Sequence, residues 1–172
     1  SRAEYPEPPE AIEFRWAGEA ARLSGDLVHR LLQSVAEQGL DTWLARGGLD
    51  ASEAWCLAQL AREGVRGEAA LPVIRRTRKA VETCLSSETG RWILKDHEAA
   101  RCEWAITALL EGQPVNLVLD RTFVDEETRW IIDYKTSSHS GGDLEGFLAS
   151  EEERYREQLA RYREAVALKE TR

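Results

Sequence analysis

Two aspartates and a lysine stand where two apolar segments of the chain end. The first segment, residues 115–121, is rich in Val and Leu and contains Asp120, and the second, residues 130–137, contains Asp133 and Lys135. Each segment has strand length, and the acidic stretch between them is typical of a turn, so the sequence predicts an antiparallel hairpin. Charged side chains at such positions are candidates for chemistry.

The spacing of these residues limits the chemistry they could do. Residues two apart in a strand point to the same face, so Asp133 and Lys135 would share one side and Tyr134 would point to the other. If Asp120 ends the neighbouring strand, its carboxylate can reach the same point. Two carboxylates beside an ammonium group are typical of metal-dependent phosphodiester hydrolysis. The alternative is a hairpin whose charges lie on a solvated edge.

The acid-x-Lys triplet carries little information alone. With 31 acidic residues in a chain of 172, about 0.7 such triplets are expected by chance. The hypothesis therefore depends on Asp120, on the hairpin and on polar residues elsewhere. Glu103, on a strand expected over residues 100–110, could join the acidic site or form an ordinary strand-edge ion pair, and we favour the ion pair.

Length and composition fit one globular α/β domain. Of the 172 residues, 42% are hydrophobic and 31% are charged, and no segment approaches membrane-spanning length. No charged-then-apolar leader is visible, so we expect a cytoplasmic protein without membrane contact. The chain begins with serine and lacks methionine, so we expect a fragment or a processed piece.

Cysteine spacing and net charge argue against several classes of protein. Cys56, Cys84 and Cys102 are far apart and form no CxxC pair, so we expect inert thiols and neither a zinc ribbon nor a disulfide framework. The net charge of −8 argues against a stand-alone DNA-binding protein, because polyanions bind positive surfaces. A bound divalent cation or a larger assembly would offset this charge.

The first half of the chain is expected to be helical. Residues 1–10 are rich in proline and suit a lead-in. A helix with an apolar stripe is predicted from Ser24, as its cap, to Gly39. His29 lies at the margin of that stripe, where it could reach a neighbouring site or remain a boundary residue.

Three more helices are expected, over about residues 50–64, over about residues 71–85 and from about Ser150. The second carries a basic cluster that could touch a phosphate backbone, but we interpret it as a solvated face. On the last helix, Gln158 and Tyr162 share one side. They suit a nucleotide or phosphate contact, or else a core-facing helix whose tyrosine hydroxyls reach solvent.

Four short motifs in this order resemble those of RecB-type nucleases. These nucleases belong to the PD-(D/E)XK superfamily and include the carboxy-terminal part of RecB and AddA helicase-nucleases. The resemblance covers roughly residues 23–165, although Leu119 stands where the superfamily name has proline. The matching stretches are GDLVHRLL (25–32), LDR (119–121), IDYKT (132–136) and QLARY (158–162).

The resemblance implies an α/β fold with a restriction-endonuclease-like core, in which a mixed sheet is flanked by helices. It implies a lead-in over residues 1–22 and a single nuclease domain over residues 23–172. That domain would be helical over residues 23–90 and would hold the catalytic sheet and helix over residues 91–168. The implied cofactor is Mg²⁺, with Mn²⁺ expected to substitute. No iron-sulfur cluster is expected, because relatives that bind one use four cysteines.

The resemblance also implies roles for individual residues. The implied metal ligands are His29, Asp120, Asp133 and the backbone carbonyl of Tyr134. Lys135 would orient or deprotonate water, so the implied catalytic residues are Asp120, Asp133 and Lys135. The expected DNA contacts are Gln158, Tyr162, Arg121 and Thr136.

The expected partners are DNA, as a single strand, and helicase domains of the same parent chain, with a partner subunit as a further candidate. No Walker A pattern occurs, so ATP-driven translocation would reside elsewhere in that parent chain. One alternative is a non-catalytic DNA-guiding or docking domain that retains the nuclease fold. Another is a plain α/β domain, which predicts that His29 and Asp120 lie far apart.

Overall fold

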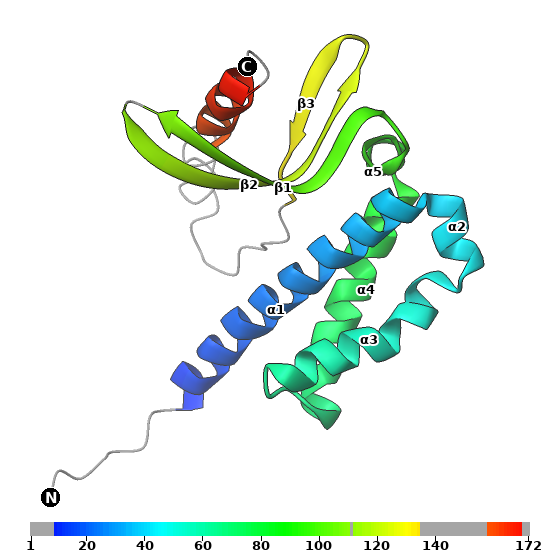
Figure 1. Cartoon of the computed structure of the whole chain (residues 1–172). Coiled ribbons are helices and arrows are strands. Elements are labelled where there is room, and N and C mark those ends of the chain that lie inside the picture. Colours follow the sequence, from blue (N-terminus) through cyan, green and yellow to red (C-terminus); the bar gives the residue numbers. More distant parts are fainter. Residues whose placement is uncertain (1–8, 111, 135–157, 170–172) are drawn as a thin grey trace, which may run out of the picture.

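The computed structural model describes residues 9–110, 112–134 and 158–169, with side chains from residue 18 onward. A long helix, α1 (Pro9–Gln38), lies between a three-stranded sheet and the other helices of the amino-terminal half (Figure 1). Among the described residues, no helix is both long enough and apolar enough to cross a membrane.

Helix α1 is longer than the sequence pattern predicts. It begins at Pro9 instead of Ser24, because proline is tolerated in the first turn of a helix. Ser24 is not a cap but a fully buried residue, whose hydroxyl accepts a hydrogen bond from Thr77 Oγ1 at 3.2 Å. The stretch expected as a lead-in, residues 1–22, is therefore helical from Pro9 onward. Gly39, at φ 82°, follows the helix as predicted.

The remaining helices form a bundle against one face of α1 (Figure 1). The helices predicted near residues 50–64 and 71–85 are confirmed as α3 and α4, and α5 covers a stretch that the sequence pattern does not assign. The elements are α2 (Leu40–Ala45), α3 (Gly48–Arg62), the 3-10 turn η1 (Gly67–Ala69), α4 (Ala70–Ser86) and α5 (Glu88–Leu94).

The larger hydrophobic core holds α1 against α3 and α4. Its members on α1 recur at helical spacing, and burying each such side chain contributes about 1.5–3 kcal/mol. Ion pairs also hold α4 against α3. Arg78, in the basic cluster of α4, pairs with Asp50 at 2.7 Å and with Glu53 at 3.3 Å on α3. The buried α1 residues are Leu23, Leu27, Val28, Leu31, Leu32 and Val35.

The sheet has the order β1-β2-β3, and both pairs of neighbouring strands are antiparallel. The strands are β1 (Glu98–Leu110), β2 (Gln113–Asp125) and β3 (Thr128–Ile132). Glu126 and Glu127, at φ 48° and 60°, form the two-residue loop between β2 and β3, as in a tight hairpin. The predicted hairpin and its acidic turn are thereby confirmed.

A second, smaller core lies between the sheet and the carboxy-terminal helix, residues 158–169. Tyr162, Ala165 and Val166 of that helix pack against Ile106 and Leu119 of the sheet. The helix covers the face of the sheet opposite to α1 (Figure 1). The expected α/β architecture, a sheet flanked by helices with a helical amino-terminal half, is confirmed. The strands within the described residues are all antiparallel, so the parallel pairing of a mixed sheet is not seen among them.

Candidate metal centre

Two carboxylates lie in one row across the sheet, and a third follows the end of β3. Strands β1 and β2 are paired on both sides of Glu103 and Asp120, and this register places Glu103 opposite Asp120. The last pair of β2 and β3 joins Arg121 and Ile132, and Asp133 follows directly after the end of β3. Like charges on directly opposite strand positions destabilise a sheet. Such a row is expected where a cation offsets the repulsion.

The central carboxylate, Asp120, is fixed by the main chain just beyond β3. Its Oδ2 accepts a hydrogen bond of 2.7 Å from the backbone N–H of Tyr134. The side chain is only 14% exposed, so this bond forms in surroundings largely shielded from water. It holds the chain after Ile132 against β2 and keeps the Tyr134 backbone beside Asp120.

His29 reaches this row from α1. Its Nε2 lies 2.8 Å from the carbonyl oxygen of Tyr134, and its Nδ1 lies 3.6 Å from Oδ1 of Asp120. The ring also meets the Tyr134 ring edge-on, with centroids 5.7 Å apart. A plain α/β domain predicts that His29 and Asp120 lie far apart, and these distances contradict that alternative.

The contacts of the imidazole indicate where positive charge is needed. A carbonyl oxygen only accepts hydrogen bonds, so Nε2 of His29 donates to Tyr134. In a neutral ring, Nδ1 then directs a lone pair towards the Asp120 carboxylate at 3.6 Å. Two acceptors that face each other repel, and a cation beside them removes that repulsion.

Glu103 completes the group from β1. His29, Glu103 and Asp120 each offer one ligand atom, and these three atoms lie within 4.8 Å of one another. Glu103 has φ 46° and lies in β1 near a register shift, and such irregularities redirect side chains. The expected strand-edge ion pair is wrong, since no salt bridge of Glu103 exists among the described residues. Its position opposite Asp120 follows from the β1–β2 turn, and counting back from that turn is the sequence signal that could have identified it.

Asp133 is held by a different partner from the other two carboxylates. It lies just after β3, and its Oδ1 accepts a hydrogen bond of 3.4 Å from Gln158 Nε2. Gln158 Nε2 also lies 2.6 Å from the hydroxyl of Tyr162. Asp133 is not part of the compact group around His29. The carboxy-terminal helix therefore orients Asp133, while α1 and β1 supply the neighbours of Asp120.

Two of the expected DNA contacts have structural roles instead. Arg121 is 2% exposed, and its guanidinium donates to the carbonyl oxygens of Ile93 at 2.6 Å and Lys95 at 2.9 Å, at the end of α5. Positive charge is favourable at a helix C-terminus. Tyr162 is 7% exposed and packs in the smaller core. Neither side chain is available to a nucleic acid, so both expectations are corrected.

Lys135 and Thr136 lie outside the described residues. The described chain reaches Tyr134, the residue directly before Lys135. Burial raises the pKa of the Tyr134 phenol, so the Tyr134 side chain is unsuited to proton transfer near neutral pH. The part of Tyr134 that faces the site is its backbone carbonyl.

The donor set fits a divalent cation. Carboxylate and carbonyl oxygens are the ligands that Mg²⁺ prefers, and imidazole nitrogen is accepted more readily by Mn²⁺. Neighbouring ligands at about 2.1 Å from an octahedral ion lie about 3 Å apart. His29 Nδ1, which carries the lone pair, and Oδ1 of Asp120 are 3.6 Å apart, which exceeds that spacing by about 0.6 Å. The residues present therefore suit Mg²⁺ or Mn²⁺.

The thiols take no part in this group. Burial raises the pKa of Cys56 to about 11, and burial also raises the pKa of Cys84 and of Cys102. A raised pKa keeps a thiol protonated and unreactive at neutral pH. These raised pKa values agree with the inert thiols that the sequence predicts.

The chain belongs to the PD-(D/E)XK nuclease superfamily, whose family model matches residues 10–172. Comparisons with curated proteins and with solved structures find no significant match. Nucleases of this superfamily use divalent metal ions, in agreement with the donor set around Asp120.

Proposed function

We propose that this chain is a Mg²⁺-dependent deoxyribonuclease domain that hydrolyses phosphodiester bonds and accepts Mn²⁺ in place of Mg²⁺. One observation carries the proposal: His29 from α1 and Glu103 from β1 converge on Asp120, and the Tyr134 carbonyl beyond β3 lies 2.8 Å from His29 Nε2. Separate parts of the chain thus supply one group of cation ligands. Superfamily membership supports the same class of reaction.

His29, Glu103, Asp120 and the Tyr134 carbonyl hold the cation in this proposal. When bound, a divalent cation supplies Lewis acidity towards water and a counter-charge for the phosphodiester. His29 has a second role, because its Nε2 bond to Tyr134 fixes the chain that leads into Lys135. Asp120 supports the same segment through the Tyr134 N–H.

Asp133 and Lys135 complete the proposed machinery. Asp133 follows the end of β3, and its carboxylate, oriented by Gln158, adds a ligand on that side. Lys135 orients the attacking water or takes its proton, as an amine beside a cation can do. Gln158 is thus a positioning residue, and any contact that it makes with DNA is secondary.

The substrate and setting extend the motif resemblance. The order of the four motifs supports a RecB-type, exodeoxyribonuclease V-like domain that acts on single-stranded DNA in recombination or repair. In that setting, helicase domains of the same parent chain would deliver the strand. Such a motor would also offset the acidic charge of the chain, because it would bring DNA to the site.

Cleavage of labelled linear and circular single-stranded DNA tests this proposal. The chain with Mg²⁺ or Mn²⁺ should cut the DNA, and EDTA should abolish the cutting. Asp120→Asn and Lys135→Ala should each lower the rate at least about 100-fold. Asp41→Asn, which removes an exposed carboxylate at the start of α2, is the charge-matched control and should cut normally.

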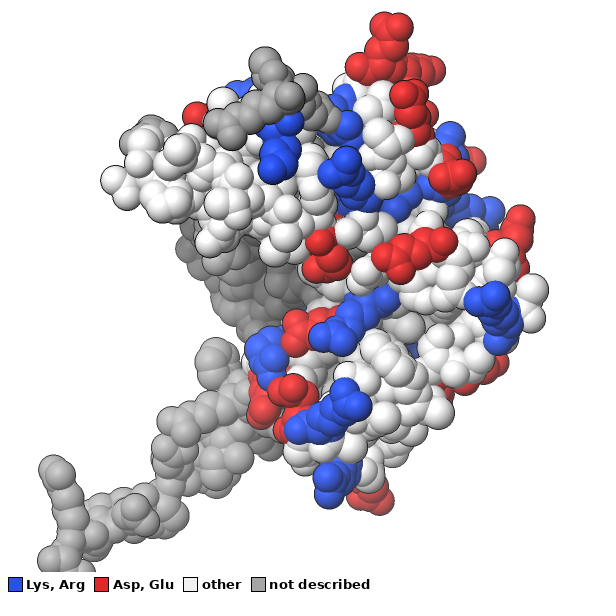
Figure 2. Space-filling view, in the orientation of Figure 1, with Lys and Arg blue, Asp and Glu red and all other residues white. Residues whose placement is uncertain are grey.

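The net charge of −8 favours a second candidate, a docking or DNA-guiding domain that retains the fold. Lys and Arg are interspersed with Asp and Glu over the face drawn in Figure 2, without a continuous basic surface. A docking domain would bind its partner equally well after Asp120→Asn, and it would cut no DNA with either metal. Cleavage that survives both Asp120→Asn and EDTA would contradict the proposed nuclease site.

A further inference from the structure

A hollow of about 670 Å³ opens beside the candidate metal centre. Its wall is formed by α1, by the end of α3 and by Glu103 of β1. Because His29 and Glu103 also line it, the hollow is continuous with the metal centre. Arg30 of α1 and Arg62 of α3 lie on the same wall. The proposed cation site therefore opens into a space lined by two guanidinium groups.

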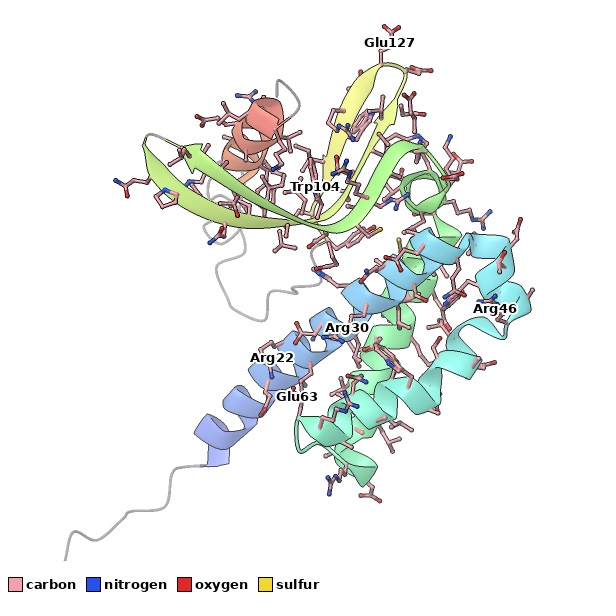
Figure 3. The ribbon with its side chains drawn as sticks, in the orientation of Figure 1. Arg22, Arg30, Arg46, Glu63, Trp104 and Glu127 are labelled. Atoms are coloured by element: carbon pink, nitrogen blue, oxygen red, sulfur yellow. The ribbon has the colours of Figure 1, made fainter. Side chains whose placement is uncertain are left out.

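The other acidic side chains of this hollow, Asp26 and Glu63, pair with one arginine. Arg22 donates to Asp26 at 3.0 Å and to Glu63 at 3.3 Å. Figure 3 shows Arg22 on α1 beside Glu63 at the end of α3. Asp26 and Glu63 thus share one arginine. Apart from the ligand group itself, these two carboxylates face three guanidinium groups, those of Arg22, Arg30 and Arg62, so one net positive charge remains.

Arg30 and Arg62 are exposed, and neither forms an ion pair or a hydrogen bond with another side chain in the described ranges. Acidic partners are abundant in this chain, with 31 acidic residues against 23 basic ones. Figure 3 shows Arg30 on the stretch of α1 that lies nearest the sheet. Two unpaired guanidinium groups that line one hollow beside a cation site point to an anionic ligand.

We propose that this hollow binds the phosphate backbone of a single DNA strand next to the metal centre, with Arg30 and Arg62 as phosphate contacts. Guanidinium groups bind phosphate oxygens in a bidentate manner. A space of this size accommodates a few nucleotides of one strand but not a duplex. The hollow with these two arginines is a local track for the DNA strand. Such a track lets an acidic protein hold DNA without a positive overall surface.

This inference rests on the proposed function, and a binding measurement tests it separately from cleavage. Fluorescence anisotropy of a labelled oligothymidylate in EDTA reports binding without metal or turnover. Arg30→Ala and Arg62→Ala should each raise Kd about tenfold at low salt. Each should also lower the slope of log K against log salt by about 0.7, the value for one phosphate contact on a single strand. Arg75→Ala removes an exposed arginine of α4 outside the hollow and is the matched control.

A small substrate separates the two claims further. Bis-p-nitrophenyl phosphate reaches the metal centre without filling the track, so its hydrolysis in Mn²⁺ by wild type and by the Arg75→Ala control reports the metal centre alone. With an oligonucleotide, Arg30→Ala and Arg62→Ala should show a raised KM relative to both of these proteins. Wild-type protein that cuts neither substrate would refute the nuclease proposal, while the anisotropy result would still stand. Variants of Arg30 and Arg62 that match Arg75→Ala in Kd and in salt slope would overturn the track, even if cleavage is normal.

Discussion

His29 Nε2 lies 2.8 Å from the carbonyl oxygen of Tyr134, although 105 residues separate them in the chain. The contact exists because α1 lies against the sheet where β3 ends, and because Asp120 holds the Tyr134 N–H at 2.7 Å. One peptide segment is thus fixed from both sides. This arrangement places the backbone of Tyr134, and not its side chain, at the centre of the site.

The phenol of Tyr134 should therefore be dispensable. Its hydroxyl is buried and has no hydrogen-bond partner within the described part of the chain, and leaving such a group unsatisfied costs free energy. Tyr134→Phe should be about 1 kcal/mol more stable to urea than wild type. Cleavage and Mn²⁺ affinity should not change. A loss of Mn²⁺ binding in this variant, with the fold intact, would show that the hydroxyl takes part in the site.

Arg121 should matter for folding more than for DNA. Its guanidinium is buried and satisfies the carbonyls of Ile93 and Lys95 at the end of α5. Arg121→Met should lower the free energy of unfolding by about 3 kcal/mol or more, because two charge-assisted hydrogen bonds are lost. Arg101→Met is the control: Arg101 lies exposed over the Trp104 ring at 4.4 Å, and its loss should cost less than about 1 kcal/mol. Equal stability of the two variants would contradict the assigned role.

Asp125 should make the stability of the fold depend on pH in the acid range. A hydrogen bond from the Trp92 indole, followed by the charges of Lys95 and His97, holds the pKa of Asp125 below its ordinary value of 3.8. A carboxyl whose pKa is lower in the folded chain stabilises the fold above its unfolded pKa. That contribution is lost as the pH falls through the folded pKa.

The corresponding variant is Asp125→Asn. It should be less stable than wild type at pH 7, and the difference should shrink as the pH falls below about 4. Urea denaturation at a series of pH values measures this difference. A gap between the two proteins that stays constant down to pH 2 would mean that the charge of Asp125 contributes nothing.

The sequence predicts the sheet better than the start of the first helix. Alternating apolar residues and the acidic loop at Glu126 and Glu127 locate the hairpin, because these patterns are local. The helix start is misplaced because Ser24 resembles a cap, whereas its burial against Thr77 depends on the packing of α4. Spacing along the sequence cannot distinguish a serine that caps a helix from a serine that is buried by another helix.

The same distinction applies to the candidate site. The motif order identifies His29 and Asp120, and the structure brings these two together. The expectation for Glu103 fails because the place of Glu103 depends on the register of the strands. The expectation for Arg121 fails because the alternation of side chains in β2 directs Arg121 into the protein. Lys135 and Thr136 stay predictions, since they lie outside the described residues.

Titration of Mn²⁺ by calorimetry, on wild type and Asp120→Asn, tests the central claim most directly. Asparagine retains an oxygen that can accept the Tyr134 N–H, so the fold should survive while the charge is lost. We expect binding by wild type and by the Asp41→Asn control, and at least about tenfold weaker binding by Asp120→Asn. Equal affinity in all three proteins would mean that the converging residues around Asp120 are not a metal centre.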